Sequence, residues 1–142
     1  MGSTALLLAA ANGKERVVDL LLQRGAEINK QNNGGIAALM TAAANGHERV
    51  VDLLLQHGAE INKQDSNGNA ALLAAATSGH ERVVDMLLRR GAKVNLQSSS
   101  GGTALMGAAA QGDERVVDLL IRCGAEVNLL SLIHISEPTR PY

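Results

Sequence analysis

Near the start of the chain, two short hydrophobic patterns predict a pair of helices. The first pattern places small and apolar residues on one face at helical spacing, at Ala5, Leu6, Ala9, Ala10 and Gly13. The second pattern points apolar residues inward, at Val17, Val18, Leu21 and Leu22, and leaves polar residues outside, at Arg16, Asp19 and Gln23. Because small residues let a neighbouring backbone approach closely, we expect the first helix to pack against another helix.

Local signals support the second helix and mark its end. Glu15 lies in the expected first turn, where the helix dipole favours an acidic residue, and Arg16 is expected to pair with Asp19 at i,i+3 spacing. Gly25 lies where a helix C-terminus favours a left-handed residue, with Arg24 in the last turn. About a dozen residues then follow that are rich in Asn and Gly, which is typical of a turn or hairpin.

This unit of two helices and a loop recurs four times. The sequence Glu-Arg-Val-Val-Asp occurs at residues 15–19, 48–52, 81–85 and 114–118, with a period of 33, and residues 2–34 and 35–67 are identical at 24 of 33 positions. The repeats are 1–34, 35–67, 68–100 and 101–128, the last of them incomplete, and residues 129–142 belong to no repeat. A helix pair of this size cannot bury its apolar face alone, so the copies predict an all-α solenoid of stacked helix-turn-helix units.

The composition indicates that the core of this solenoid is thin. The chain has 142 residues and is 46% hydrophobic, which argues against disorder throughout. It has no Trp and no Phe, and its one Tyr is the last residue, Tyr142. A core of Ala, Leu, Val and Ile suits closely packed helices better than a sandwich or a barrel.

Charge, cysteine content and apolar runs argue against several classes of protein. The net charge is −1 and the charges are mixed, whereas a nucleic-acid binder carries a basic patch or stripe. Cys123 is the one cysteine and cannot form an intrachain disulfide, so a reducing, cytoplasmic location is expected. The longest apolar runs, residues 5–11 and 70–76, are far shorter than the roughly 20 residues that span a bilayer. Neither nucleic acid nor a membrane is therefore an expected partner.

The repeated motifs also match a known family pattern. That pattern runs Asp-x-x-Gly-x-Thr-Pro-Leu-His-x-Ala-Ala, then Gly-His, then Val-Val-x-Leu-Leu-Leu-x-x-Gly-Ala-Asp-Val-Asn. The first copy gives Thr4-Ala5-Leu6, Ala9-Ala10, Val17 to Leu22 and Gly25-Ala26-Glu27-Ile28-Asn29, and the third keeps Asp65-Ser66-Asn67-Gly68 and Gly79-His80. Over residues 2–128 the chain thus resembles the ankyrin-repeat family. The resemblance implies an ankyrin-repeat solenoid with hairpin-like loops between the helix pairs.

The copies depart from the family pattern where the first helix begins. The family's Pro is replaced in all four copies, by Ala5, Ala38, Ala71 and Ala104. Its Thr survives only as Thr4 and Thr103, so Ala37 and Ala70 lack the hydroxyl that caps a helix N-terminus, a loss of about 1 kcal/mol. We expect Ala37→Thr and Ala70→Thr each to raise the unfolding midpoint.

The resemblance implies a non-catalytic protein–protein interaction module, without cofactor or metal. Family members usually bind a partner through a concave surface made of hairpin tips and the exposed side of the first helix. The matching positions in repeats 1 and 2 are Ser3, Leu8, Asn33, Gly34, Ile36, Thr41 and Asn45. Those in repeats 3 and 4 are Ser66, Asn67, Asn69, Ala74, Ser78, Ser99, Ser100, Gly102, Gly107 and Gln111. We expect a protein partner, whose identity the sequence does not specify.

The composition of these positions leaves an alternative open. Interface hot spots are enriched in Trp, Tyr and Arg, and the predicted surface has none of them. The alternative is a structural or engineered repeat scaffold, or a fragment of a longer array, with no partner of its own. An enzyme is not expected, because no nucleophile, base and orienting group recur at catalytic spacing.

Two further sets of residues have structural interpretations. His47 and His80 are one repeat apart, about one helix spacing of 8–10 Å, and no carboxylate or thiol cluster joins them. We therefore expect packing at the helix start and no metal site. One Asn recurs in every copy, as Asn29, Asn62, Asn95 and Asn128. It matches a family position that usually braces the hairpin and in some members is a substrate for asparaginyl hydroxylation; bracing is the role expected here.

The two ends of the array lack polar capping repeats, so weak self-association through the ends is expected. Residues 129–142 change abruptly in composition, and residues 130–140 resemble the translation of a transposon-end adapter used in preparing sequencing libraries. This segment is therefore expected to be foreign to the repeats. We expect residues 129–135 to lie against repeat 4 as a makeshift cap and residues 136–142 to be loose. Deletion of residues 130–142 should then lower stability or promote association.

Overall fold

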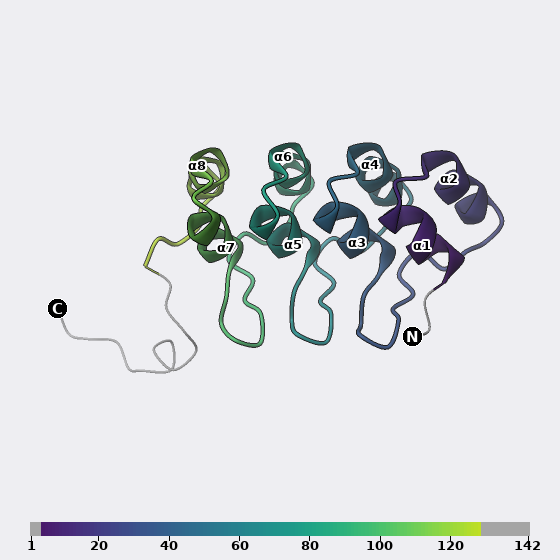
Figure 1. Ribbon diagram of the computed structural model, residues 1–142, viewed down its shortest axis with the longest axis horizontal. Coiled ribbons are helices and arrows are strands. Elements are labelled where there is room, and N and C mark those ends of the chain that lie inside the picture. The colour runs from purple at the N-terminus through teal and green to yellow at the C-terminus, as the bar shows by residue number, and fades with distance from the viewer. Residues whose placement is uncertain (1–3, 129–142) are drawn as a thin grey trace.

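The computed structural model describes residues 4–128 and contains one helix pair for each repeat (Figure 1). The helices are α1 (Ala5–Ala11), α2 (Glu15–Gln23), α3 (Ala38–Ala44), α4 (Glu48–Gln56), α5 (Ala71–Thr77), α6 (Glu81–Arg89), α7 (Ala104–Gln111) and α8 (Glu114–Arg122). Within residues 4–128 there are no strands, which confirms the predicted all-α solenoid. The predictions for Ser3 and for residues 129–142 fall outside the described residues.

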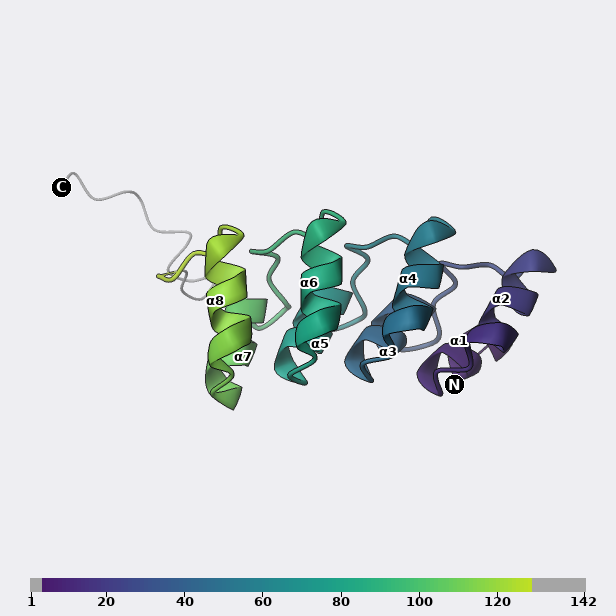
Figure 2. The same cartoon turned by 90° about the horizontal axis from the view of Figure 1, so that it is seen from above.

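The helix pairs stack in a single row, as Figure 2 shows for α2, α4, α6 and α8. First helices pack on first helices, and second helices pack on second helices. Ala10, Ala43 and Ala76 are fully buried, so small side chains fill the space between neighbouring first helices. Leu54 and Leu87 are fully buried in the second helices. The core is therefore thin and aliphatic, in keeping with the composition.

Each inner helix has a neighbour on both sides, and its apolar residues are divided between these two interfaces. The prediction that Val17 points inward is wrong, because this side chain is 47% exposed. Its equivalents in the other repeats are all buried: Val50, Val83 and Val116. This position faces the preceding repeat, and repeat 1 packs only against repeat 2. Ala5 is exposed for the same reason, while Ile121, on the opposite side of repeat 4, is 43% exposed.

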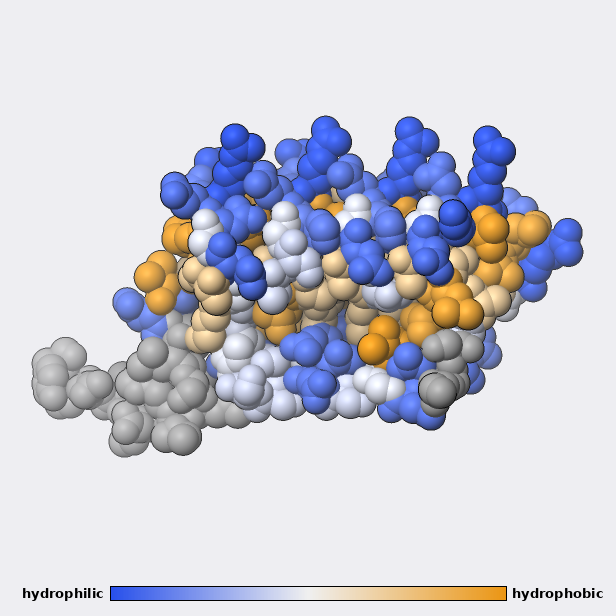
Figure 3. Space-filling model, in the orientation of Figure 1, coloured by the Kyte–Doolittle hydropathy of each residue, from blue (hydrophilic) through white to orange (hydrophobic). Residues whose placement is uncertain are grey.

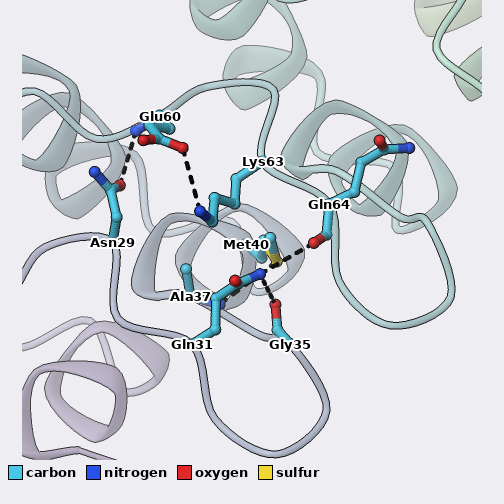
Figure 4. Close-up of polar contacts among 8 residues, drawn as sticks. All are labelled: Asn29, Gln31, Gly35, Ala37, Met40, Glu60, Lys63 and Gln64. Atoms are coloured by element: carbon cyan, nitrogen blue, oxygen red, sulfur yellow. Dashed lines mark hydrogen bonds and ion pairs between the residues drawn. The ribbon is translucent and has the colours of Figure 1, made fainter.

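The N-termini of the first helices differ in their capping. The Thr4 hydroxyl oxygen accepts a hydrogen bond from Leu7 N at 3.1 Å, and Thr103 does the same for Met106 N at 3.3 Å. Ala37 and Ala70 make no side-chain cap. Instead, the backbone N–H of Ala37 donates to the Met40 sulfur at 3.5 Å (Figure 4). The absence of a hydroxyl cap at these two positions agrees with the sequence analysis.

The repeated Asn braces one repeat against the next. The Asn29 side-chain oxygen accepts from Glu60 N at 2.9 Å (Figure 4), and the bond recurs from Lys93 N to Asn62 and from Glu126 N to Asn95. A second tie was not predicted. The Gln31 side-chain nitrogen donates to the Gly35 carbonyl within its own hairpin, at 2.6 Å, and to the Gln64 carbonyl of the next repeat, at 3.0 Å. These bonds tie the loops and hairpins of neighbouring repeats to one another.

His47 and His80 also join neighbouring repeats. The Nε2 atom of His47 donates to the Ala11 carbonyl at 2.9 Å, and His80 Nε2 donates to the Ala44 carbonyl at 3.0 Å. The His47 ring lies against Gly13, where an added Cβ atom would come within 2.6 Å of Nδ1. Gly13 has a φ of +69°, so it is needed both for its backbone conformation and for this close approach. Both histidines thus pack at a helix start, as predicted.

Charged side chains on the second helices pair both within one helix, as Arg89–Asp85 and Arg122–Asp118 do, and across repeats. The predicted pair between Arg16 and Asp19 does not form, and Asp19 accepts instead from the Gln23 amide at 3.1 Å. In the other repeats the arginine at this position lies 3.4–3.7 Å from the preceding repeat's glutamate, in the pairs Arg49–Glu15, Arg82–Glu48 and Arg115–Glu81. These pairs are exposed, so each contributes little stability.

Candidate functional site

The hairpins are closed turns that are tied to one another at their tips. Asn32 Oδ1 accepts from Gly34 N and Ile36 N, at 2.9 and 3.0 Å, and Gly35 at φ +77° completes the turn. The Ser66 backbone N–H then donates to the Gly34 carbonyl of the preceding hairpin at 2.9 Å, and Ser99 N donates to the Asn67 carbonyl at 2.8 Å. The tips therefore form a connected row below the helices (Figure 1).

The hairpins and first helices together form one surface, which we call the hairpin-helix face (residues 31–46, 64–79 and 97–112). An open groove of about 400 Å³ lies on this face between α3 and α5. It is lined by Ile36, Met40, Thr41, Ala44, Asp65, Asn69, Leu73, Ala74, Thr77 and Ser78. Five of these residues were predicted from the sequence: Ile36, Thr41, Asn69, Ala74 and Ser78.

The other predicted residues lie outside this groove. Asn33, Gly34, Ser66, Asn67, Ser99 and Ser100 are exposed on the hairpin tips, and Gly102 is half-buried at the end of the last hairpin. Gln111 lines a separate open hollow of about 600 Å³ with Ser78, near the starts of α6 and α8. The Asn45 amide nitrogen donates to the Ala11 carbonyl at 3.0 Å, so this side chain also ties repeat 2 to repeat 1.

Two apolar residues that line the groove, Met40 and Leu73, were not predicted from the sequence, and we call them its floor. Met40 is 6% exposed and Leu73 is half-buried, and both occupy the position of the family's His. Thr77 was also missed. A Cβ atom on Gly107 would collide with the Thr77 hydroxyl, so the glycine lets α7 approach α5 here. The replacement of a polar family residue by Met or Leu was the available signal for an apolar floor.

Charge is distributed unevenly over the molecule. Figure 3 shows the most hydrophilic side chains along the edge formed by the second helices. On the hairpin-helix face, Asp65 is the one residue that is charged at neutral pH. Within residues 4–128, no three His, Cys, Asp or Glu side chains are grouped so that they could hold a metal ion.

Stacked helix pairs and projecting hairpins define a helical repeat protein, with an open groove on one face. A family model described as ankyrin repeats (3 copies) matches residues 1–65 and again residues 39–131. The chain therefore belongs to the ankyrin-repeat family. Members of this family are generally protein–protein interaction modules and typically non-enzymatic. A search of curated proteins gave no match. In the part of the chain that the structure describes, no helix is long and apolar enough to cross a membrane.

Proposed function

We propose that this chain binds a protein partner through the hairpin-helix face, with the groove between α3 and α5 at the centre of the interface. The groove itself carries this proposal, because it joins residues from two repeats into one concave, mainly apolar site. Of its lining residues, Met40 is buried and Leu73 half-buried, whereas the hydroxyl-bearing Thr77 is exposed. An apolar centre with a polar rim is the usual arrangement of a protein interface.

The ties between hairpins support a preformed site. Gln31 and Gln64 each bond to their own hairpin and to the next repeat, and Ser66 N bonds to the preceding tip. A surface that is already ordered loses less conformational entropy when a partner binds. The lower entropic cost of binding matters here, because the hairpin-helix face has no Trp, Tyr or Arg.

A selection of random linear peptides displayed on phage tests the proposal. Peptides are selected on the wild-type chain and then measured against Ala74→Arg, which extends a long side chain into the groove. The control is Gln56→Arg on α4, because α6 and α8 already carry Arg89 and Arg122 at that position. We expect Ala74→Arg to weaken binding by about tenfold or more and Gln56→Arg to leave it unchanged. Peptides that bind Ala74→Arg as well as wild type would contradict the proposal.

The same selection separates an interaction module from a scaffold with no partner of its own. A scaffold predicts no enrichment of peptides over an unrelated bait protein.

We further propose that the chain acts in the cytoplasm, since its one cysteine, Cys123, is exposed and unpaired. We also propose weak self-association, because each end of the array carries exposed apolar side chains, such as Leu20 and Val127.

A further inference from the structure

Asp65 is the one residue of the hairpin-helix face that is charged at neutral pH. It is half-buried and lines the groove between α3 and α5. Within the part of the chain that the structure describes, its carboxylate forms no ion pair with Lys, Arg or His. The groove therefore combines an apolar floor with one uncompensated negative charge.

The turn itself does not require that charge. Asp65 Oδ1 accepts from Asn67 N and Asn69 N, both at 2.9 Å. Asn32 makes the same two bonds in the preceding hairpin with a neutral amide, and the Ser98 hydroxyl accepts from Gly102 N at 3.1 Å in the following one. Asn, Asp and Ser thus close equivalent turns, and the second carboxylate oxygen of Asp65 takes no part. What Asp65 adds is a charge beside the groove.

The groove lies in the middle of the array, between repeats 2 and 3. Thr41, Ala74 and Gly107 occupy equivalent positions on α3, α5 and α7. Ala74 is small enough to leave space beside Thr41, and the α3–α5 groove of about 400 Å³ results. Sites of a few hundred cubic ångströms suit a small group of side chains rather than a whole protein surface. The space therefore fits an anchoring side chain from a partner segment.

We propose that the partner presents a segment with one large apolar side chain and an adjacent Lys or Arg. The apolar side chain enters the groove over Met40 and Leu73, and the cation pairs with the free oxygen of Asp65. This inference rests on the proposed function, and it adds the chemistry of the segment that binds. Complementary charge at the edge of an apolar contact selects the partner more than it strengthens binding.

The peptides selected on the wild-type chain provide the probe. We expect them to be enriched in Lys or Arg next to Leu, Met or Phe, and to bind Asp65→Asn about three- to fivefold more weakly, because an exposed or half-exposed ion pair contributes little more. Added salt should weaken binding to wild type and have less effect on Asp65→Asn. Asn32→Asp is the matched control, because it makes the reciprocal exchange in the neighbouring turn and leaves Asp65 in place. It should not weaken binding, and thermal melts should show both variants folded.

The outcomes distinguish this inference from the proposed function. If the peptides lose binding to Ala74→Arg but carry no excess of basic residues and bind Asp65→Asn like wild type, the groove is the site and the inference about charge is wrong. If neither Ala74→Arg nor Asp65→Asn weakens binding, both proposals fail. Equal losses for Asp65→Asn and Asn32→Asp would point to disturbed turns and would overturn the role of the charge.

Discussion

Single positions explain why nearly identical copies are not equivalent. Val17 and Val18 are neighbours in the sequence, yet the first is 47% exposed and the second fully buried. Helical periodicity predicts which side chains of a helix point away from solvent. It does not predict which neighbouring repeat they meet, and that decides burial at each end of the row.

The helix caps give a test at this scale. Ala70 and Thr103 occupy equivalent positions and are both 3% exposed, so the extra atoms of a threonine fit this site in the same fold. We expect Ala70→Thr to cap α5 at Leu73 N, as Thr103 caps α7, and to stabilise the chain by about 1 kcal/mol. A thermal melt should show a midpoint raised by about 4 °C. Thr103→Ala should lower it by a similar amount. An unchanged midpoint for Ala70→Thr would mean that the α5 N-terminus gains nothing from a hydroxyl.

At the scale of helices and hairpins, the sequence predicted most of the fold. Each second helix begins at the repeated glutamate, and Gly25 adopts the predicted left-handed conformation, with φ +91°. Contacts between repeats were harder to foresee, because they join residues about one period apart. The pairing of Arg49 with Glu15 and the Gln31–Gln64 tie depend on how closely the repeats stack, which no local pattern records.

The bond between Asn62 and the next repeat tests whether these ties stabilise the stack. Asn62→Ala removes the acceptor for Lys93 N, and we expect a loss of about 0.5–1.5 kcal/mol in the free energy of unfolding. Urea melts measure this loss. Asn128→Ala is the control, because Asn128 is exposed and its oxygen makes no such bond within the described residues. Equal effects of the two substitutions would show that the loss is unrelated to the tie.

For the molecule as a whole, the stacking of repeats separates the surface by charge. The second helices carry the charged edge, whereas the hairpin-helix face is nearly neutral and holds the groove. Five of the groove residues could be predicted, because they match the positions through which the family usually binds a partner. Met40 and Leu73 could not be predicted, because they line the groove only where two repeats pack together.

Exposed apolar residues at the ends of the row predict weak association between chains. Leu20 is 49% exposed on the repeat 1 side, and Ile121 is 43% exposed on the repeat 4 side. We expect sedimentation velocity to show association that rises with concentration, and Leu20→Lys to reduce it because a charge resists burial. Gln23→Lys, on the same helix, should leave association unchanged. A wild-type chain that is monomeric at all concentrations would contradict this prediction.

The most direct test of the central claim is to map a bound peptide on the protein by NMR. A peptide selected on the wild-type chain is titrated into isotope-labelled protein, and the backbone amide shifts are followed. Our account predicts the largest changes around the groove, at Thr41, Asn69, Ala74 and Ser78, with little change on α4 and α6. Changes centred on the charged edge of the second helices, with the groove amides unmoved, would contradict it.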